Sequence, residues 1–163
     1  MGIEITVIDD SDYVGWSASA VRENEIYMVN VPSMVANVIA ALRVYSRVCT
    51  PVVQYNKISR LNLLDHGNED GIEIGEDWVT MGSLSRYEAS LKQLRGRFDA
   101  GGFVHVQHCH AGQNRSLIVA LARLWNAPVY AGTGYHNPLY RINFGDYVRA
   151  EPNGHVTSGV ARP

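Results

Sequence analysis

The stretch Phe103-Val104-His105-Val106-Gln107-His108-Cys109-His110 decides the fold class of this chain. Its first five residues have the composition of a core β-strand. From about Asn114 the apolar residues recur with helical spacing, at Leu117, Leu121 and Leu124. We therefore expect Cys109 at a turn between a strand and a helix.

Strands and helices alternate on both sides of this stretch. Upstream, the pattern predicts strands at residues 3–8, 26–31 and 58–64, with an aspartate-rich turn at 9–12, and a tight β segment at 71–75. It predicts helices over residues 34–48 and from Ser83 or Ser85 to Phe98, the second one ended by Gly101-Gly102. Downstream, Pro128 ends a helix, residues 129–131 form a strand, and residues 147–156 form a terminal hairpin. This order predicts a single α/β domain with a mostly parallel central sheet.

Composition limits the classes of protein that this chain can be. Of its 163 residues, 46% are hydrophobic and 18% are charged, which suits one globular domain and excludes coiled coil, collagen and disorder. The net charge of −2 gives no broad basic surface, so we expect no nucleic-acid partner and no membrane partner. Cys49 and Cys109 are too few for a disulfide framework. With no leader segment visible, we expect a cytoplasmic protein, or an effector exported without a cleavable signal peptide.

His66 and Cys109 are the candidate reactive residues. Both follow predicted strands of a parallel sheet, and ligands of such sheets gather at the carboxyl ends of the strands. A thiol is a useful nucleophile only as the thiolate, which a nearby imidazole or helix N-terminus favours. From chemistry alone, Cys109 could equally be a small buried residue and His66 a loop residue. Asp65 could complete a triad, but we expect a solvated turn carboxylate, because neighbours on a strand point to opposite sides.

Several segments of the chain, over about residues 52–156, resemble the caspase-like cysteine peptidases of the gingipain, caspase and separase group. The similarity is closest to the bacterial domains of this type in large surface proteins and toxin-like effectors. The segments that carry it are Leu61-Asn62-Leu63-Leu64-Asp65-His66-Gly67, the glycine-bounded residues 71–75, the helix at 84–98, Gly102-Phe103-Val104-His105-Val106-Gln107-His108-Cys109, Leu121-Ala122-Arg123-Leu124-Trp125 and Ala127-Pro128-Val129-Tyr130-Ala131-Gly132-Thr133-Gly134.

The resemblance implies a three-layer sandwich and a cysteine endopeptidase that needs no cofactor. It implies that Cys109 attacks a peptide carbonyl, that His66 shuttles a proton, and that the amides of Gly67 and Cys109 hold the oxyanion. The substrate would be a protein or peptide, or the protein itself in self-processing. The position before the cysteine, often small in this family, is His108 here. The substrate side chain preferred at P1 and the oligomeric state stay open.

A second motif overlaps the same cysteine. Residues 108–116 spell HCxAGxxRS, which resembles the phosphate loop of dual-specificity phosphatases. In that hypothesis Cys109 would attack phosphorus, Arg115 would clamp the phosphate, Ser116 would help expel the thiolate, and Asp77 would protonate the leaving group. The phosphatase hypothesis leaves His66-Gly67 and the last third of the chain unexplained. A third hypothesis is a catalytically idle caspase-like module used for binding.

Three histidines crowd around Cys109, which raises the question of zinc. Along a strand His105 and Cys109 face one way while His108 and His110 face the other, so the four side chains do not converge. We therefore expect no metal, with His105 a packed or hydrogen-bonded strand residue. Trp78, Trp125 and Tyr130 are expected in the core or at its rim.

Overall fold

A computed structural model describes residues 2–9, 25–48 and 57–163 of the chain. Residues 10–12 of the predicted turn and Cys49 lie outside the described residues. The described strands and helices, in chain order, are β1 (Gly2–Asp9), β2 (Glu25–Met28), α2 (Val31–Val48), β3 (Lys57–Leu64), β4 (Gly71–Ile74), β5 (Asp77–Thr80), α3 (Leu84–Leu91), β6 (Phe98–Gln107), α4 (Arg115–Trp125), β7 (Val129–Gly132), β8 (His136–Asn137), β9 (Ile142–Asn143), β10 (Tyr147–Ala150) and β11 (Val156–Val160).

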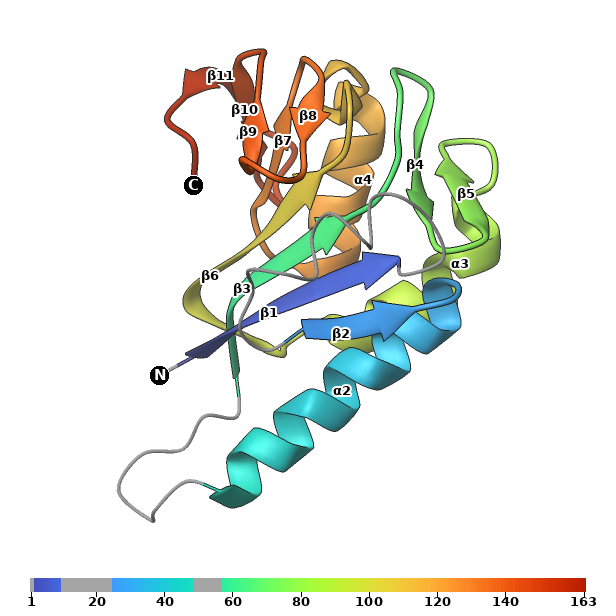
Figure 1. The fold of residues 1–163 in the computed structure, drawn as a ribbon, viewed down its shortest axis with the longest axis vertical. Coiled ribbons are helices and arrows are strands. Elements are labelled where there is room, and N and C mark those ends of the chain that lie inside the picture. Colours follow the sequence, from blue (N-terminus) through green and yellow to red (C-terminus); the bar gives the residue numbers. More distant parts are fainter. Residues whose placement is uncertain (1, 10–24, 49–56) are drawn as a thin grey trace.

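In the described part of the chain, seven strands form one sheet in the order β11-β10-β7-β6-β3-β1-β2 (Figure 1). Neighbours from β2 to β7 run parallel, while β10 pairs antiparallel with both β7 and β11. The predicted terminal hairpin is thus confirmed as β10 and β11. Two further pairs, β4 with β5 and β8 with β9, stand apart as small antiparallel hairpins. The prediction of an α/β domain with a mostly parallel sheet is confirmed.

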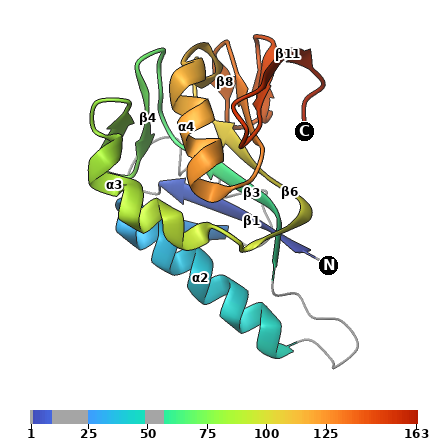
Figure 2. The same ribbon diagram turned by 180° about the vertical axis from the view of Figure 1, so that it is seen from behind.

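The helices α2, α3 and α4 lie on one face of this sheet, as the two opposite views show (Figures 1 and 2). Alternate strand residues such as Ile5, Leu61 and Val104 are fully buried in one large apolar cluster with residues of α2 and α4, among them Trp125. This mostly parallel sheet flanked by helices is consistent with the predicted three-layer sandwich. No helix of the described ranges is both long and apolar enough to cross a bilayer.

The opposite face of the same strands carries polar side chains. Because successive residues of a strand point to opposite sides, Thr6, Asn62 and His105 face away from the apolar cluster. They are nevertheless buried, with exposed fractions of 3%, 3% and 0%. We call this side of β1, β3 and β6 the polar face. Its far end, where the strands stop, holds the candidate site.

The helix predicted from Ser83 or Ser85 to Phe98 is shorter than expected. Helix α3 ends at Leu91, a single 3-10 turn follows over Lys92–Leu94, and β6 already begins at Phe98. Gly101 and Gly102 lie inside β6 and end no helix. A Cβ on Gly102 would stand 2.3 Å from the carbonyl oxygen of Ile58, so this glycine allows the backbones of β3 and β6 to meet closely.

Candidate active site

His66 and Cys109 line the same pocket. It has a volume of about 200 Å³ and lies where β3 ends at Leu64 and β6 ends at Gln107. The strands β3 and β6 are parallel neighbours in the sheet, which brings the residues after them to one edge. The pocket is lined by Leu64, Asp65, His66, Gln107, Cys109, His136 and Pro138. Two of the predicted site residues, 43 positions apart in the sequence, therefore share one cavity.

The β4–β5 hairpin holds the His66 turn through its backbone. The carbonyl oxygen of His66 accepts a hydrogen bond from the N–H of Glu73 at 2.9 Å, and Gly67 forms an isolated antiparallel bridge with Ile72. The chain after β3 is thus tied to this small hairpin by one bridge and one backbone hydrogen bond.

Asp65 does not have the environment we expected. Its side chain is only 4% exposed, so the prediction of a solvated turn carboxylate is wrong. One oxygen, Oδ1, accepts the backbone N–H of His66 at 2.8 Å, and the other, Oδ2, accepts that of Gly75 at 2.9 Å. These two hydrogen bonds partly offset the cost of burying the carboxyl group. Burial raises the pKa of Asp65 to about 7, against the lowering effect of the two hydrogen bonds.

Gly67 brings the two reactive segments into contact. A Cβ at this position would lie 2.8 Å from the Cβ of His108 and 3.2 Å from the carbonyl oxygen of Cys109. The absence of a side chain is therefore needed for the His66 turn to lie against the Cys109 turn. We expected this glycine to make room for substrate, and in the structure it also makes room for the cysteine loop.

The Cys109 thiol is partly exposed and contacts the backbone of His136. Its Sγ accepts the N–H of His136 at 3.3 Å, and the thiol lies 3.9 Å from the carbonyl oxygen of the same residue. The helix α4 starts only at Arg115, after a 3-10 turn over Ala111–Gln113, so Cys109 does not sit at the first turn of a long helix.

His108 faces away from the pocket, as the strand alternation predicts. It is fully buried, and its Nε2 donates to the carbonyl oxygen of Glu73 at 2.7 Å. Burial lowers the pKa of His108 to about 4, so the ring is neutral at pH 7. One residue of the hairpin, Glu73, therefore contacts both reactive segments through its main chain: its N–H binds His66 and its C=O binds His108.

The residues of the phosphatase hypothesis do not gather around Cys109. Arg115 donates to Ser158 Oγ at 3.0 Å and, with Ser116, lines a different cavity. The carboxylate of Asp77 accepts from the N–H of Val31 at 2.9 Å and from the Tyr87 hydroxyl at 3.3 Å. Amides that would have to point at a phosphate are engaged within the loop region. For example, the N–H of His110 binds the carbonyl oxygen of Gly134 at 2.8 Å.

The histidines near Cys109 have separate partners. His105 Nδ1 lies 3.0 Å from Arg60 Nη2, His108 binds Glu73, and His110 Nδ1 lies 3.1 Å from the carbonyl oxygen of Thr133. His105 is the buried, hydrogen-bonded strand residue that we predicted. Within residues 2–9, 25–48 and 57–163, no three metal-ligating side chains gather closely enough to hold a metal ion.

Four residues of the pocket were not predicted from the sequence. Leu64 and Gln107 stand two positions before His66 and Cys109, so strand alternation alone would have placed them on the same side as the reactive residues. His136 and Pro138 come from the hairpin after β7, which no motif singled out. The glycines at 132 and 134 before them were the available sign of a tight return toward the sheet.

The chain matches one described protein family over most of its length. Residues 26–135 match the model of a family described as "Domain of unknown function (DUF4347)", a span that includes both His66 and Cys109. No curated protein and no solved structure matches the chain. Because the match covers more than half of the 163 residues, the chain belongs to the DUF4347 family.

Proposed function

We propose that this domain is a caspase-like cysteine endopeptidase with Cys109 as nucleophile and His66 as the proton carrier. The observation that carries the proposal is that these two residues, from separate segments, line one pocket of about 200 Å³ at the ends of neighbouring parallel strands. An imidazole and a thiol in one partly closed cavity are the minimal set for acyl transfer through a covalent intermediate.

The reaction would proceed in two halves. The Cys109 thiol gives its proton to the His66 imidazole, and the thiolate adds to the carbonyl carbon of the scissile peptide bond. As the tetrahedral intermediate collapses, the C–N bond breaks and the His66 imidazolium protonates the departing amine. Water, deprotonated by His66, then attacks the thioester, and the C–S bond breaks to return Cys109 and release the acid product.

Backbone amides would stabilise the charge that develops on the carbonyl oxygen. The N–H groups of Gly67 and Cys109 are our candidates, because a Cβ on Gly67 would come within 3.2 Å of the Cys109 carbonyl oxygen, so the two main chains run side by side. Preorganised donors of this kind typically contribute about 3–4 kcal/mol to acyl transfer. The contact of the His136 N–H with Sγ at 3.3 Å would help to position the sulfur for attack.

A phosphatase receives less support from the same geometry. A phosphate-binding arginine must reach the anion that the cysteine attacks. Arg115 instead contacts Ser158 and lines a cavity that does not include Cys109.

The test is cleavage of a diverse peptide library by the purified chain, with products identified by mass spectrometry. We expect cleavage that is lost in Cys109→Ala and falls by at least about 100-fold in His66→Ala. His155→Ala is the matched control, because His155 is exposed in the β10–β11 turn, and it should cleave like wild type. Cleavage that persists in Cys109→Ala, or none by the wild-type chain, would contradict the proposal. Hydrolysis of p-nitrophenyl phosphate that is lost in Arg115→Lys would favour the phosphatase instead.

A further inference from the structure

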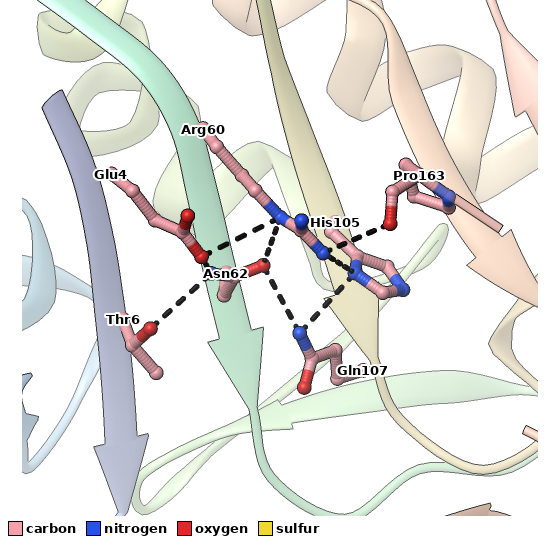
Figure 3. Close-up of polar contacts among 7 residues, drawn as sticks. All are labelled: Glu4, Thr6, Arg60, Asn62, His105, Gln107 and Pro163. Carbon is pink, nitrogen blue, oxygen red and sulfur yellow. Dashed lines mark hydrogen bonds and ion pairs between the residues drawn. The ribbon is translucent and has the colours of Figure 1, made fainter. Parts of the chain in front are cut away.

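A hydrogen-bond network on the polar face has only one consistent assignment of donors and acceptors (Figure 3). It starts from Arg60, whose guanidinium can only donate. Arg60 Nε lies 2.8 Å from Asn62 Oδ1, and Arg60 Nη2 lies 3.0 Å from His105 Nδ1. The atoms of Asn62 and His105 that face Arg60 are therefore both acceptors.

The remaining contacts of Asn62 agree with this assignment. Its Nδ2 donates to Glu4 Oε1 at 2.8 Å and to Thr6 Oγ1 at 3.2 Å. A flipped Asn62 amide would set its nitrogen against a guanidinium and its oxygen against a carboxylate. For His105, an acceptor at Nδ1 means that the neutral ring carries its proton on Nε2.

These two acceptors fix the orientation of Gln107. Its Nε2 lies 3.0 Å from Asn62 Oδ1 and 3.2 Å from His105 Nδ1, and only an N–H₂ group can face both. The other atom of the amide, Oε1, points away from Arg60 toward the arrowheads that mark the ends of β1 and β3 (Figure 3). Gln107 is 4% exposed, and its Oε1 has no hydrogen-bond partner among the described residues.

The end of the strands toward which Oε1 points is where the Cys109 pocket lies, and Gln107 lines that pocket. A buried acceptor without a partner is costly, and a ligand that brings a donor removes the cost. The pocket lining contains no Lys or Arg, and its charged residue, Asp65, is itself an acid. A carboxylate entering the pocket would thus meet the Gln107 Oε1 acceptor without a Lys or Arg to balance its charge.

We propose that Gln107 is a specificity-determining residue: its fixed Oε1 makes the Cys109 pocket take a substrate side chain that donates a hydrogen bond, such as a carboxamide, and reject a carboxylate. The inference rests on the proposed peptidase function in that the pocket is taken to receive the side chain at P1. The chemical class of that side chain then follows from the orientation of the Gln107 amide.

The experiment compares tripeptide acyloxymethyl ketones that differ only at P1, with Gln, Glu or Leu. The Cys109 thiolate displaces the carboxylate leaving group of the probe and forms a thioether, so labelling needs no turnover. Rates are measured by intact-protein mass spectrometry, with Cys109→Ala reporting labelling at other sites. We expect the Gln probe to exceed the Glu probe by at least about tenfold, which is the scale of one buried unpaired polar group, and to exceed the Leu probe. Equal or faster labelling by the Glu probe overturns the inference.

Loosening the network supplies a second variant. In Arg60→Met the His105 Nδ1 acceptor is no longer imposed, and the Asn62 amide is held only by its contacts to Glu4 and Thr6. The hold on Gln107 weakens, so its amide can turn and present Nε2 to the pocket. We expect the Gln-to-Glu rate ratio to fall toward one while the Leu rate is unchanged. Arg162→Met is the matched control, because Arg162 lines the same polar cavity as Arg60 and has no part in fixing Gln107. Suppose that Arg60→Met keeps both the wild-type Gln-to-Glu rate ratio and the wild-type thermal unfolding midpoint. The hydrogen-bond network is then not the cause of the preference for Gln.

The two proposals fail in different ways. If peptide cleavage depends on Cys109 but the probes show no preference for Gln over Glu, the specificity inference is wrong and the peptidase stands. If the probes label Cys109 with the expected order but no peptide in the library is cleaved, the peptidase is wrong and the pocket preference stands. Absence of Cys109 labelling by every probe overturns both.

Discussion

The two faces of the central sheet are made by the same three strands and held together by different forces. Toward the helices, Ile5, Leu61 and Val104 pack in a continuous apolar cluster. On the polar face, Thr6, Asn62 and His105 are buried almost as deeply but meet through hydrogen bonds. Apolar packing has no direction, whereas a hydrogen bond fixes which atom faces which. The first face therefore supplies stability, and the second supplies orientation, which Gln107 carries to the pocket.

Removing an apolar side chain should have the largest effect. Leu61 is fully buried in the cluster beneath the helices, so Leu61→Ala should lower the free energy of unfolding by about 2–5 kcal/mol. On the polar face, Thr6→Ala should cost about 1 kcal/mol, because it removes one acceptor of the Asn62 amide. Urea unfolding followed by circular dichroism measures both. Equal losses would mean that the two faces do not differ in the way described.

Two buried groups at the end of the sheet, Asp65 and His108, should make stability depend on pH in opposite directions. The pKa of Asp65 is raised to about 7, so between about pH 4 and 7 the folded state binds the proton more tightly than the unfolded state. Asp65 therefore lowers stability as the pH rises through this range. The pKa of His108 is lowered to about 4, so between about pH 4 and 6.5 the unfolded state binds the extra proton, and His108 raises stability as the pH rises.

Single variants should expose these opposing slopes. From about pH 4 to 7, wild type should lose roughly 4 kcal/mol relative to Asp65→Asn. From about pH 4 to 6.5, wild type should gain roughly 3 kcal/mol relative to His108→Gln. Urea unfolding of the three proteins across this range measures the differences. Slopes of the same sign in the two comparisons would show that one of the groups is not buried as described.

A smaller effect is expected where the two reactive segments touch. Gly67→Ala puts a methyl group 2.8 Å from the Cβ of His108, so it should cost about 1–3 kcal/mol through overpacking. The His66 turn must shift away from Cys109 to relieve the contact, so labelling of Cys109 by the P1 Gln probe should slow as well. Gly101→Ala is the control, since a Cβ at Gly101 has no atom within 4 Å. Wild-type labelling in Gly67→Ala would show that the contact does not matter to the site.

The smallest effect should come from Arg115, which lines a cavity that does not include Cys109. Its side chain contacts Ser158 at the surface, so Arg115→Lys should change the free energy of unfolding by less than about 0.5 kcal/mol. The rate at which iodoacetamide alkylates Cys109 should stay at the wild-type value. A clear change in that rate would place the guanidinium closer to the thiol than the cavity lining indicates.

Much of this arrangement could be predicted from sequence because it depends on local periodicity. The ends of two strands, at Leu64 and Gln107, were predicted correctly, although the second strand begins at Phe98 rather than at Phe103. Parallel pairing of these strands then brings His66 and Cys109 to one edge of the sheet. The end of α3 could not be predicted, because Gly101-Gly102 was interpreted as a helix stop when its real constraint is the neighbouring strand at Ile58.

The burial of Asp65 could not be predicted from the sequence for a similar reason. Its carboxylate is drawn in by the N–H of Gly75, ten positions further along, in a turn whose position depends on the folded β4–β5 hairpin. The role of Gln107 was hidden too, because the direction of its amide follows from Arg60 on another strand. Contacts between distant segments decide both cases, and no periodic pattern encodes them.

Glu73 contacts both reactive segments through its main chain, so most side-chain substitutions at position 73 should leave these contacts intact. Since its N–H and C=O make these contacts, any amino acid except proline can stand at this position without breaking them. Alanine scanning would therefore not detect the role of Glu73 in joining the His66 turn to the Cys109 turn. At position 73 itself, an alteration of the peptide unit, such as an amide-to-ester replacement that deletes the Glu73 N–H, is needed to weaken the link between the histidine turn and the cysteine turn.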